Sequence, residues 1–225
     1  MLILAMESSA KSVSCAVCRD DELLGQYFQN SGLTHSRTLL SMTESLLKNL
    51  SLSVRDIGLV AVSSGPGSFT GVRIGVSAAI GLAWGLGIPV CGVGTLEALA
   101  YQMPEQGAVL CPVMDARRSQ VYNALFQWKD GKPVRLCEDR AISLDDLAAG
   151  LRGFDLPCLL AGDGSAISFD HLSSAGISCR MAPEQQRWQT AYGVAIAALH
   201  HEPVPPETLQ PSYLRPPQAE REREG

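Results

Sequence analysis

The sequence predicts a mixed α/β protein made of two similar lobes. With 46% apolar and 18% charged residues among 225, the chain can bury a substantial core. Apolar residues alternate with a two-residue period in some segments and follow helical spacing in others. Three strands, a helix, a strand and a helix follow one another in each half of the chain. This repeated order, βββαβα, indicates a duplicated unit.

The first half consists of segments that are bounded by glycine and polar turn residues. Each predicted strand carries an apolar run or an apolar alternation, and Thr34 can cap the first predicted helix. The predicted strands cover residues 2–8, 12–18, 23–29, 57–63 and 88–92, and the predicted helices cover residues 34–50, 70–86 and 95–103.

The second half follows the same order after residue 106. A KDGKP turn separates the second and third of its predicted strands, which form an antiparallel meander with the first. The predicted strands cover residues 109–114, 120–128, 134–142 and 157–162, and the helices begin at Ser143, near Ser165 and near Thr190, the second and third separated by a short strand.

The composition divides the chain into three parts. Residues 1–106 and 107–202 are the expected N-terminal and C-terminal lobes, and residues 203–225 form a proline-rich tail whose end we expect to be disordered. Within the tail, Tyr213, Leu214 and Arg215 form a cluster suited to docking. The sequence leaves open whether this cluster binds a partner or packs on the chain's own surface.

Charge and cysteine usage favour a cytoplasmic protein that does not bind nucleic acid by itself. The net charge of -5 repels phosphate backbones, and no basic patch is evident. Seven scattered cysteines fit a reducing compartment, and the CxxC of Cys15 and Cys18 lies on a predicted strand that points the two thiols to opposite faces. The uncharged stretch 74–96 contains six glycines and Pro89, so we expect a buried helix and strand rather than a membrane span.

The glycine-rich segment SSGPGSFTGVR, residues 63–73, joins a predicted strand to a helix N-terminus, where free amides could hold an anion. Its spacing fits neither a Walker loop nor GxGxxG, so a structural turn is favoured. Three other loops would meet it between the lobes in an actin- and sugar-kinase-like layout. The residues of this degenerate nucleotide cleft are Glu7, Ser8, Ser9, Gly65, Gly67, Asp115, Gly162, Asp163 and Gly164.

The two long helices of the first half present more apolar surface than one sheet can cover. Residues 70–86 are almost uncharged after Arg73 and rich in small side chains, and residues 34–50 carry two apolar stripes. One side can pack on the sheet while the other binds a partner, although the two helices could instead cover each other. The predicted interface residues are His35, Leu39, Met42, Leu46, Arg73, Ile74, Ser77, Ala78 and Gly81.

Segments throughout the chain resemble the TsaB (YeaZ) family: ILAMESS, THSRTLLSM, SSGPGSFTGVRIG, GVGTLEALA, MDARRSQVY and SYLR. The resemblance implies an actin/hexokinase-like (ASKHA, ribonuclease H-like) fold. It also implies a part in synthesis of threonylcarbamoyladenosine in tRNAs that read ANN codons. Members of that family are noncatalytic partners of TsaD, are joined by the ATPase TsaE and form homodimers when alone. The resemblance implies the same for this chain.

The resemblance also implies what this chain lacks. TsaD-like proteins bind a metal through an HxxxH pair, and the matching positions here are Thr95 and Leu99, which cannot replace two imidazoles. Glu7 stands where relatives often have Asp. We therefore expect no metal and no required cofactor. The rival hypothesis is an independent ATPase or phosphotransferase that uses Asp115 in the cleft, whereas a metallopeptidase lacks visible ligands.

Overall fold

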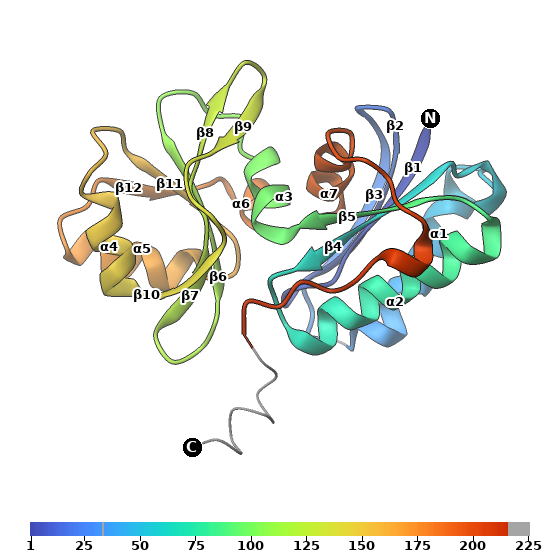
Figure 1. The fold of residues 1–225 in the computed structure, drawn as a ribbon, viewed down its shortest axis with the longest axis horizontal. Coiled ribbons are helices and arrows are strands. Elements are labelled where there is room, and N and C mark those ends of the chain that lie inside the picture. The colour runs from blue at the N-terminus through green and yellow to red at the C-terminus, as the bar shows by residue number, and fades with distance from the viewer. Residues whose placement is uncertain (33, 216–225) are drawn as a thin grey trace.

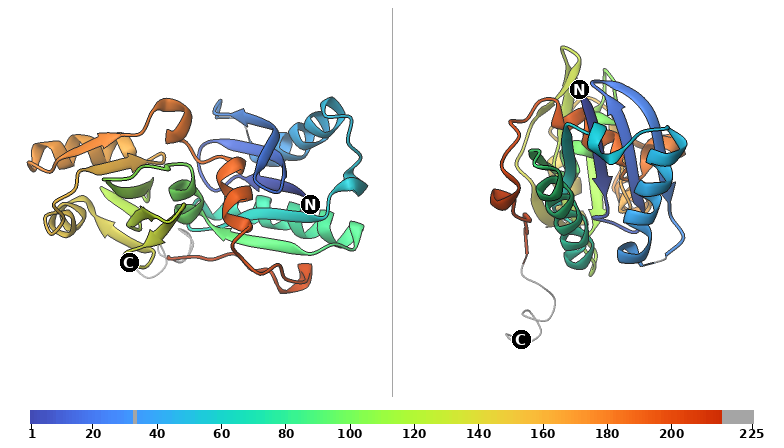
Figure 2. Two further views of the ribbon diagram at one scale, coloured as in Figure 1. Left: turned by 90° about the horizontal axis from the view of Figure 1, so that it is seen from above. Right: turned by 90° about the vertical axis from the view of Figure 1, so that its right-hand side faces the viewer.

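The computed structural model describes residues 1–32 and 34–215 and contains two lobes side by side, each built on one β-sheet (Figure 1). The predicted mixed α/β class is confirmed. The view from above in Figure 2 shows the two lobes joined in the middle by α3 (Thr95–Tyr101). The prediction of disorder at the end of the tail concerns residues 216–225, which lie outside the described residues.

The first sheet has five strands in the order β3-β2-β1-β4-β5. The first three strands pair antiparallel, and β1, β4 and β5 pair parallel, so Ala5 lies beside Ala16 on one side and Ala61 on the other. The strands are β1 (Leu2–Glu7), β2 (Val13–Arg19), β3 (Glu22–Gln29), β4 (Leu59–Gly65) and β5 (Val90–Gly94).

Helices cover both faces of the first sheet. On one face α1 (His35–Asn49) and α2 (Phe69–Leu86) pack with the buried side chains of β1, β2 and β4, and the short η1 (Val54–Asp56) leads into β4. On the other face α7 (Ala191–Ala198) packs with β1 through alanine and valine side chains. Because both faces are covered, the parallel strands are apolar on both sides.

The second sheet repeats the topology of the first. Its main path is β10-β7-β6-β11-β12, with antiparallel pairs on one side of β6 and parallel pairs on the other, which supports the predicted duplication. The strands are β6 (Val109–Asp115), β7 (Gln120–Asn123), β8 (Phe126–Lys129), β9 (Lys132–Arg135), β10 (Arg140–Ser143), β11 (Cys158–Ala161) and β12 (Cys179–Met181).

Two strands that the sequence predicts as continuous are each divided in the structure. Residues 120–128 form β7 and β8, and both pair with β6 on either side of Pro112. Proline has no N–H to donate to a neighbouring strand, so the ladder is interrupted there. At this interruption the Asn123 side-chain amide donates to the Pro112 carbonyl at 3.0 Å. Residues 134–142 divide in the same way into β9 and β10.

The predicted boundary between the lobes is wrong for the last helix. The second sheet is covered by α4 (Leu144–Leu151) and α5 (Ser165–Ser174), and the short α6 (Glu184–Arg187) follows β12. α7 instead returns to the first lobe, because its small apolar side chains fit against the first sheet. The second lobe therefore ends before residue 191 rather than at residue 202.

The tail returns along the first lobe and then crosses toward the second. Val204 and Val90 exchange backbone hydrogen bonds of 3.0 and 2.8 Å, and η2 (Pro206–Thr208) lies beside α2. Figure 1 shows the tail, in red, passing from α7 over β5 and reaching the space between the lobes. Of the two alternatives for residues 213–215, packing on the chain's own surface is the observed one.

Candidate functional site

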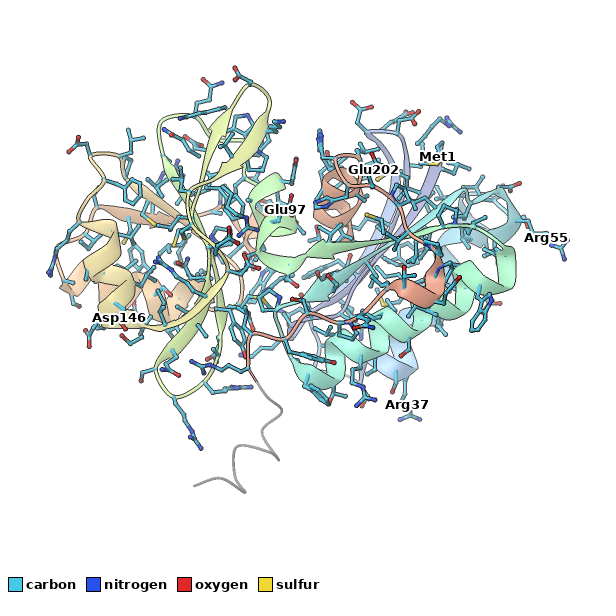
Figure 3. The ribbon with its side chains drawn as sticks, viewed as in Figure 1. Met1, Arg37, Arg55, Glu97, Asp146 and Glu202 are labelled. Atoms are coloured by element: carbon cyan, nitrogen blue, oxygen red, sulfur yellow. The ribbon has the colours of Figure 1, made fainter. Side chains whose placement is uncertain are left out.

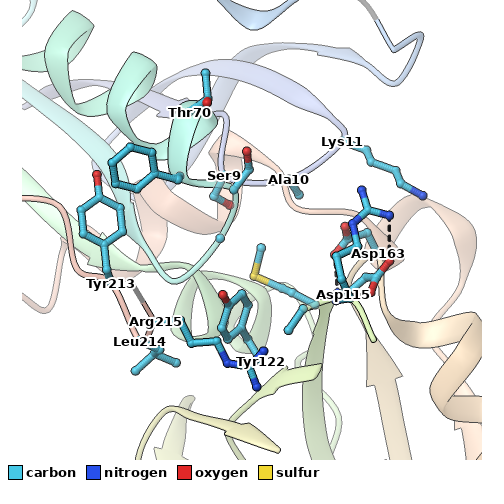
Figure 4. Close-up of a pocket in the computed structure, with 16 residues that line it drawn as sticks. Ser9, Ala10, Lys11, Thr70, Asp115, Tyr122, Asp163, Tyr213, Leu214 and Arg215 are labelled. Atoms are coloured by element: carbon cyan, nitrogen blue, oxygen red, sulfur yellow. Dashed lines mark hydrogen bonds and ion pairs between the residues drawn. The ribbon is translucent and has the colours of Figure 1, made fainter. Parts of the chain in front are cut away.

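A cavity of about 560 Å³ opens between the two lobes (Figure 4). The loop after β1 and the first turn of α2 line it from the first lobe, and the ends of β6 and β7 line it from the second. Figure 4 shows Asp115 and Asp163 on one side of the cavity and Tyr213, Leu214 and Arg215 on another. The tail is therefore a wall of this cleft.

Four of the nine residues predicted for the cleft line the cavity: Ser9, Gly67, Asp115 and Asp163. The other five are buried behind it: Glu7, Ser8, Gly65, Gly162 and Gly164. The matching loops of the two lobes do meet, as the duplication predicted. The innermost carboxylate of these loops, Glu7, however, does not line the cavity.

The glycines of the segment 63–73 bring the backbone of α2 against the loop after β1. A Cβ at Gly67 would lie 2.4 Å from the Ser9 carbonyl oxygen, and a Cβ at Gly71 would lie 2.2 Å from that of Ser8. The Ser68 side chain caps the helix by accepting from the Gly71 N–H at 3.3 Å. Close packing accounts for these glycines, which agrees with the interpretation as a structural turn.

The second lobe shows the same close approach at its corresponding loop. Gly162 has a φ of +106°, and a Cβ there would lie 2.0 Å from the Val113 carbonyl oxygen. Gly164 donates its N–H to that carbonyl at 3.2 Å. These glycines hold the loop after β11 against the end of β6, so they too have a structural explanation.

The carboxylates of the cleft are already engaged by the chain. Asp115 accepts from the Arg117 N–H at 2.8 Å and pairs with its guanidinium at 3.4 Å. Asp163 accepts from the Gln189 amide at 3.1 Å, and burial raises its pKa. Among the described residues, no three His, Cys, Asp or Glu side chains are grouped closely enough to hold a metal ion.

Glu7 is the most enclosed of these groups. It is 0% exposed, and its Oε1 accepts from the Ser9 N–H at 2.6 Å while its Oε2 has no partner. Burial raises the pKa of Glu7, and the hydrogen bonds from Ser9 oppose this effect. The protonated form is thus favoured relative to a carboxyl group in water, and the buried Glu7 side chain does not line the cavity.

The predicted partner helices lie together on the outer face of the first lobe. Leu39 and Leu46 are 1% and 2% exposed and belong to the core, so their assignment to the interface is corrected: the sheet and α2 bury that stripe. Met42 is half-buried against the same core. His35 donates from Nε2 to the Ala10 carbonyl oxygen at 2.7 Å, which ties the start of α1 to the loop after β1.

The rest of the predicted interface is accessible on α2. Arg73, Ser77 and Gly81 are exposed, and Ile74 and Ala78 are half-buried. The sequence prediction missed Trp84, which continues this stripe at helical spacing and is 68% exposed. Leu40 is 50% exposed on α1, and Arg37 points away from the same helix (Figure 3).

Gly81 and Gly85 differ from the glycines at the start of the same helix. Apart from the backbone of α2 itself, a Cβ at either position would have no atom of residues 1–32 or 34–215 within 4 Å. Packing within the lobe therefore does not require glycine at these two positions. We call the surface formed by Arg73, Ile74, Ser77, Ala78, Gly81, Trp84 and Gly85 the α2 face.

By length and composition alone, α2 could cross a membrane, with a mean hydropathy of 1.4 over its 18 residues. It packs on the first sheet through Val72, Val76 and Ala79, and a helix that covers a sheet in an α/β lobe passes the same test. The expectation of a buried helix followed by a strand is met on the sheet side of α2.

Comparisons with known proteins relate the whole chain to one group. The family model described as "TsaD: tRNA N6-adenosine threonylcarbamoyltransferase" matches residues 29–157. The tRNA threonylcarbamoyladenosine biosynthesis protein TsaB of Bacillus subtilis is 33% identical over 224 residues, which cover 98% of this chain and 96% of that protein. TsaB of Escherichia coli is 36% identical over 129 residues, 56% of this chain and 55% of that protein.

Solved structures agree with this relation. YeaZ from Pseudomonas aeruginosa superimposes with a TM-score of 0.80 at 25% identity and covers 95% of this chain and 99% of its own. A ROK family protein from Streptococcus pneumoniae superimposes with a TM-score of 0.51 at 12% identity, covering 89% of this chain and 98% of its own, and shows the shared fold alone. The predicted actin/hexokinase-like fold is confirmed.

Proposed function

Because this chain belongs to the TsaB (YeaZ) family, we propose that it is a noncatalytic scaffold or activator subunit in tRNA threonylcarbamoyladenosine biosynthesis. In this proposal it pairs with TsaD, helps to recruit TsaE and thereby supports threonylcarbamoyl transfer to adenosine in tRNAs that read ANN codons. It acts in the cytoplasm, forms a homodimer when alone and binds no tRNA by itself.

The observation that carries the proposal is the unfilled space beside Gly81 and Gly85. Glycine inside a helix costs about 0.5–1 kcal/mol relative to alanine. Among the described residues, no atom beyond the helix's own backbone lies within 4 Å of where either Cβ would be, so packing in the described part of the lobe does not offset this cost. A partner helix that approaches the α2 face closely would give both glycines a use.

The composition of the α2 face fits such a partner. Ser77, Gly81 and Gly85 recur every four residues, a spacing that lets two helix backbones approach each other. Trp84 supplies a large exposed ring beside them, and exposed aromatic side chains with little charge around them are typical of the centre of an interface. Arg73 is the one charged residue on this face.

Several features support a noncatalytic role. Thr95 and Leu99 stand where TsaD-like proteins are expected to carry their metal-binding pair, and both are fully buried. Asp115 is paired with Arg117, and the chain's own tail forms part of the cleft. The residues of the cleft are thus used to hold the fold together.

Reconstitution tests the proposal directly. The purified chain, its cognate TsaD and TsaE, ATP, substrate precursors and unmodified tRNA are combined, and threonylcarbamoyladenosine is measured by mass spectrometry of digested tRNA. We expect synthesis to depend on this chain and the chain to co-elute with TsaD in size-exclusion chromatography. Full synthesis without the chain, together with separate elution, would refute the proposal.

A second candidate function is an independent ATPase or phosphotransferase. The observation that favours it is the 560 Å³ cavity, which Asp115, Asp163 and Lys11 line together. Carboxylates beside a nucleotide can hold Mg²⁺ and its waters. ATP turnover by the isolated chain that disappears in Asp115→Ala would support this candidate. Absence of such turnover would exclude it.

A further inference from the structure

Two glycines of the first lobe leave room for the tail. A Cβ at Gly92 would lie 2.5 Å from Cδ1 of Leu209, and a Cβ at Gly65 would lie 2.0 Å from the Ser212 carbonyl oxygen. Glycine at these two positions, on β5 and at the end of β4, leaves room for the tail to lie flat against the strand ends. The Ser212 N–H then donates to the Ser64 carbonyl at 2.7 Å.

Beyond Ser212 the tail leaves the first lobe and contacts the second. The ring of Tyr213 packs against Phe69 at the start of α2, with centroids 4.8 Å apart. Two residues later, Arg215 donates from Nη2 to Oε1 of Gln120 at 2.5 Å and lies 5.8 Å from the centre of the Tyr122 ring. Gln120 and Tyr122 belong to β7 of the second lobe.

These contacts place one short segment along one wall of the cavity, where it joins the two lobes. Tyr213, Leu214 and Arg215 line it opposite the loop that carries Asp163 (Figure 4). The lobes are also joined through the core around α3 and through Gln189, whose carbonyl accepts from Ser12 Oγ at 3.2 Å and whose amide donates to Asp163 at 3.1 Å, opposite the tail. A join on one side leaves the lobes free to hinge about it, unless a second tie lies on the other side.

We propose that Ser212–Arg215 is a strap that binds the interlobe cleft from within the same chain and holds the two lobes at a fixed angle. The ligand of the cleft is thus a Tyr-Leu-Arg peptide segment supplied by the protein itself. Tyr213 and Ser212 fasten the strap to the first lobe, and Arg215 fastens it to the second. Release of either end lets the cleft open.

The strap is tested in the full-length chain with point substitutions and hydrogen–deuterium exchange. Tyr213→Ala combined with Arg215→Gln removes both side-chain attachments, and the Ser212 amide should then exchange at least about tenfold faster. Tyr213→Phe keeps the ring that packs on Phe69 and should exchange like the unaltered chain. Arg55→Gln, at an exposed arginine far from the cleft, is the matched control.

Two further readings separate the strap from general unfolding. The Val204 amide, bonded to Val90 upstream of the strap, should stay protected in every variant. Small-angle X-ray scattering should show a larger radius of gyration for the double variant alone. An unchanged Ser212 exchange rate would overturn the proposal, as would an unchanged scattering profile in a chain whose Ser212 amide has been released. Neither measurement requires a partner protein.

Discussion

One helix should respond in opposite ways to the same substitution at two glycines. At Gly81 a methyl group meets no atom within 4 Å in the part of the chain that the structure describes, apart from the backbone of α2, so Gly81→Ala gains helix propensity without a clash. We expect this variant to be about 0.5–1 kcal/mol more stable. At Gly71 the methyl group would lie 2.2 Å from the backbone oxygen of Ser8, which cannot move without displacing the loop after β1. Gly71→Ala should lose about 1–3 kcal/mol, as for other overpacked sites.

Urea unfolding followed by far-ultraviolet circular dichroism measures both free energies. The protein concentration should be low enough that light scattering reports a monomer, since association would add its own stabilisation. Gly85→Ala is a second open position and should not lose stability. A loss of stability in Gly81→Ala under these conditions would show that the α2 face is packed within the chain, and the reasoning about a partner would fail.

Three other measurements address the buried acid, the exposed ring and the thiols. Because burial raises the folded-state pKa of Glu7 above its ordinary value of 4.5, the folded state binds more protons than the unfolded state above that pH. The contribution of Glu7 to the free energy of unfolding should therefore fall as the pH rises from about 4.5 through the folded pKa. Urea unfolding at a series of pH values should show this fall in the unaltered chain and not in Glu7→Gln. Parallel curves of stability against pH for the two proteins would contradict this prediction. Trp84, 68% exposed, should shift its fluorescence to shorter wavelength when TsaD is added, and a shift of the same size in Trp84→Phe would assign the signal elsewhere. Burial raises the pKa of Cys15, Cys18 and Cys91 to about 11. An aromatic disulfide reagent should therefore label only the half-buried Cys137 and Cys179 in the native protein. Rapid labelling of more than two thiols would contradict the burial of the other cysteines.

The sequence predicts the fold well because the duplicated order of strands and helices depends on local periodicity. The three-strand meander and the helical crossover recur in both sheets, and the helices 34–50 and 70–86 match α1 and α2 closely. The interpretation of the glycine-rich segment as a structural turn agrees with its place between β4 and α2. Its precise packing against Ser8 and Ser9 depends on contacts distant in sequence, which periodicity does not report.

The errors arise where distant segments decide the outcome. A single proline on β6 divides a neighbouring strand, and the small apolar side chains of α7 fit the first sheet although α7 follows the second lobe in the chain. Leu39, Leu40 and Leu46 are all leucines on one predicted helix, yet Leu39 and Leu46 are buried and Leu40 is exposed. Only the direction in which α1 faces the sheet distinguishes them.

The most direct test of the partner surface compares the affinity of TsaD for two arginine variants. Gly81→Arg adds bulk and charge to the open part of the α2 face, and Ala149→Arg makes a similar change at an exposed position on α4 of the other lobe. Isothermal titration calorimetry should show binding weakened at least about 100-fold by Gly81→Arg, as expected for an unpaired charge in an interface. Ala149→Arg should bind like the unaltered chain. Equal affinity of the two variants would contradict the assignment of the α2 face as the surface that binds TsaD.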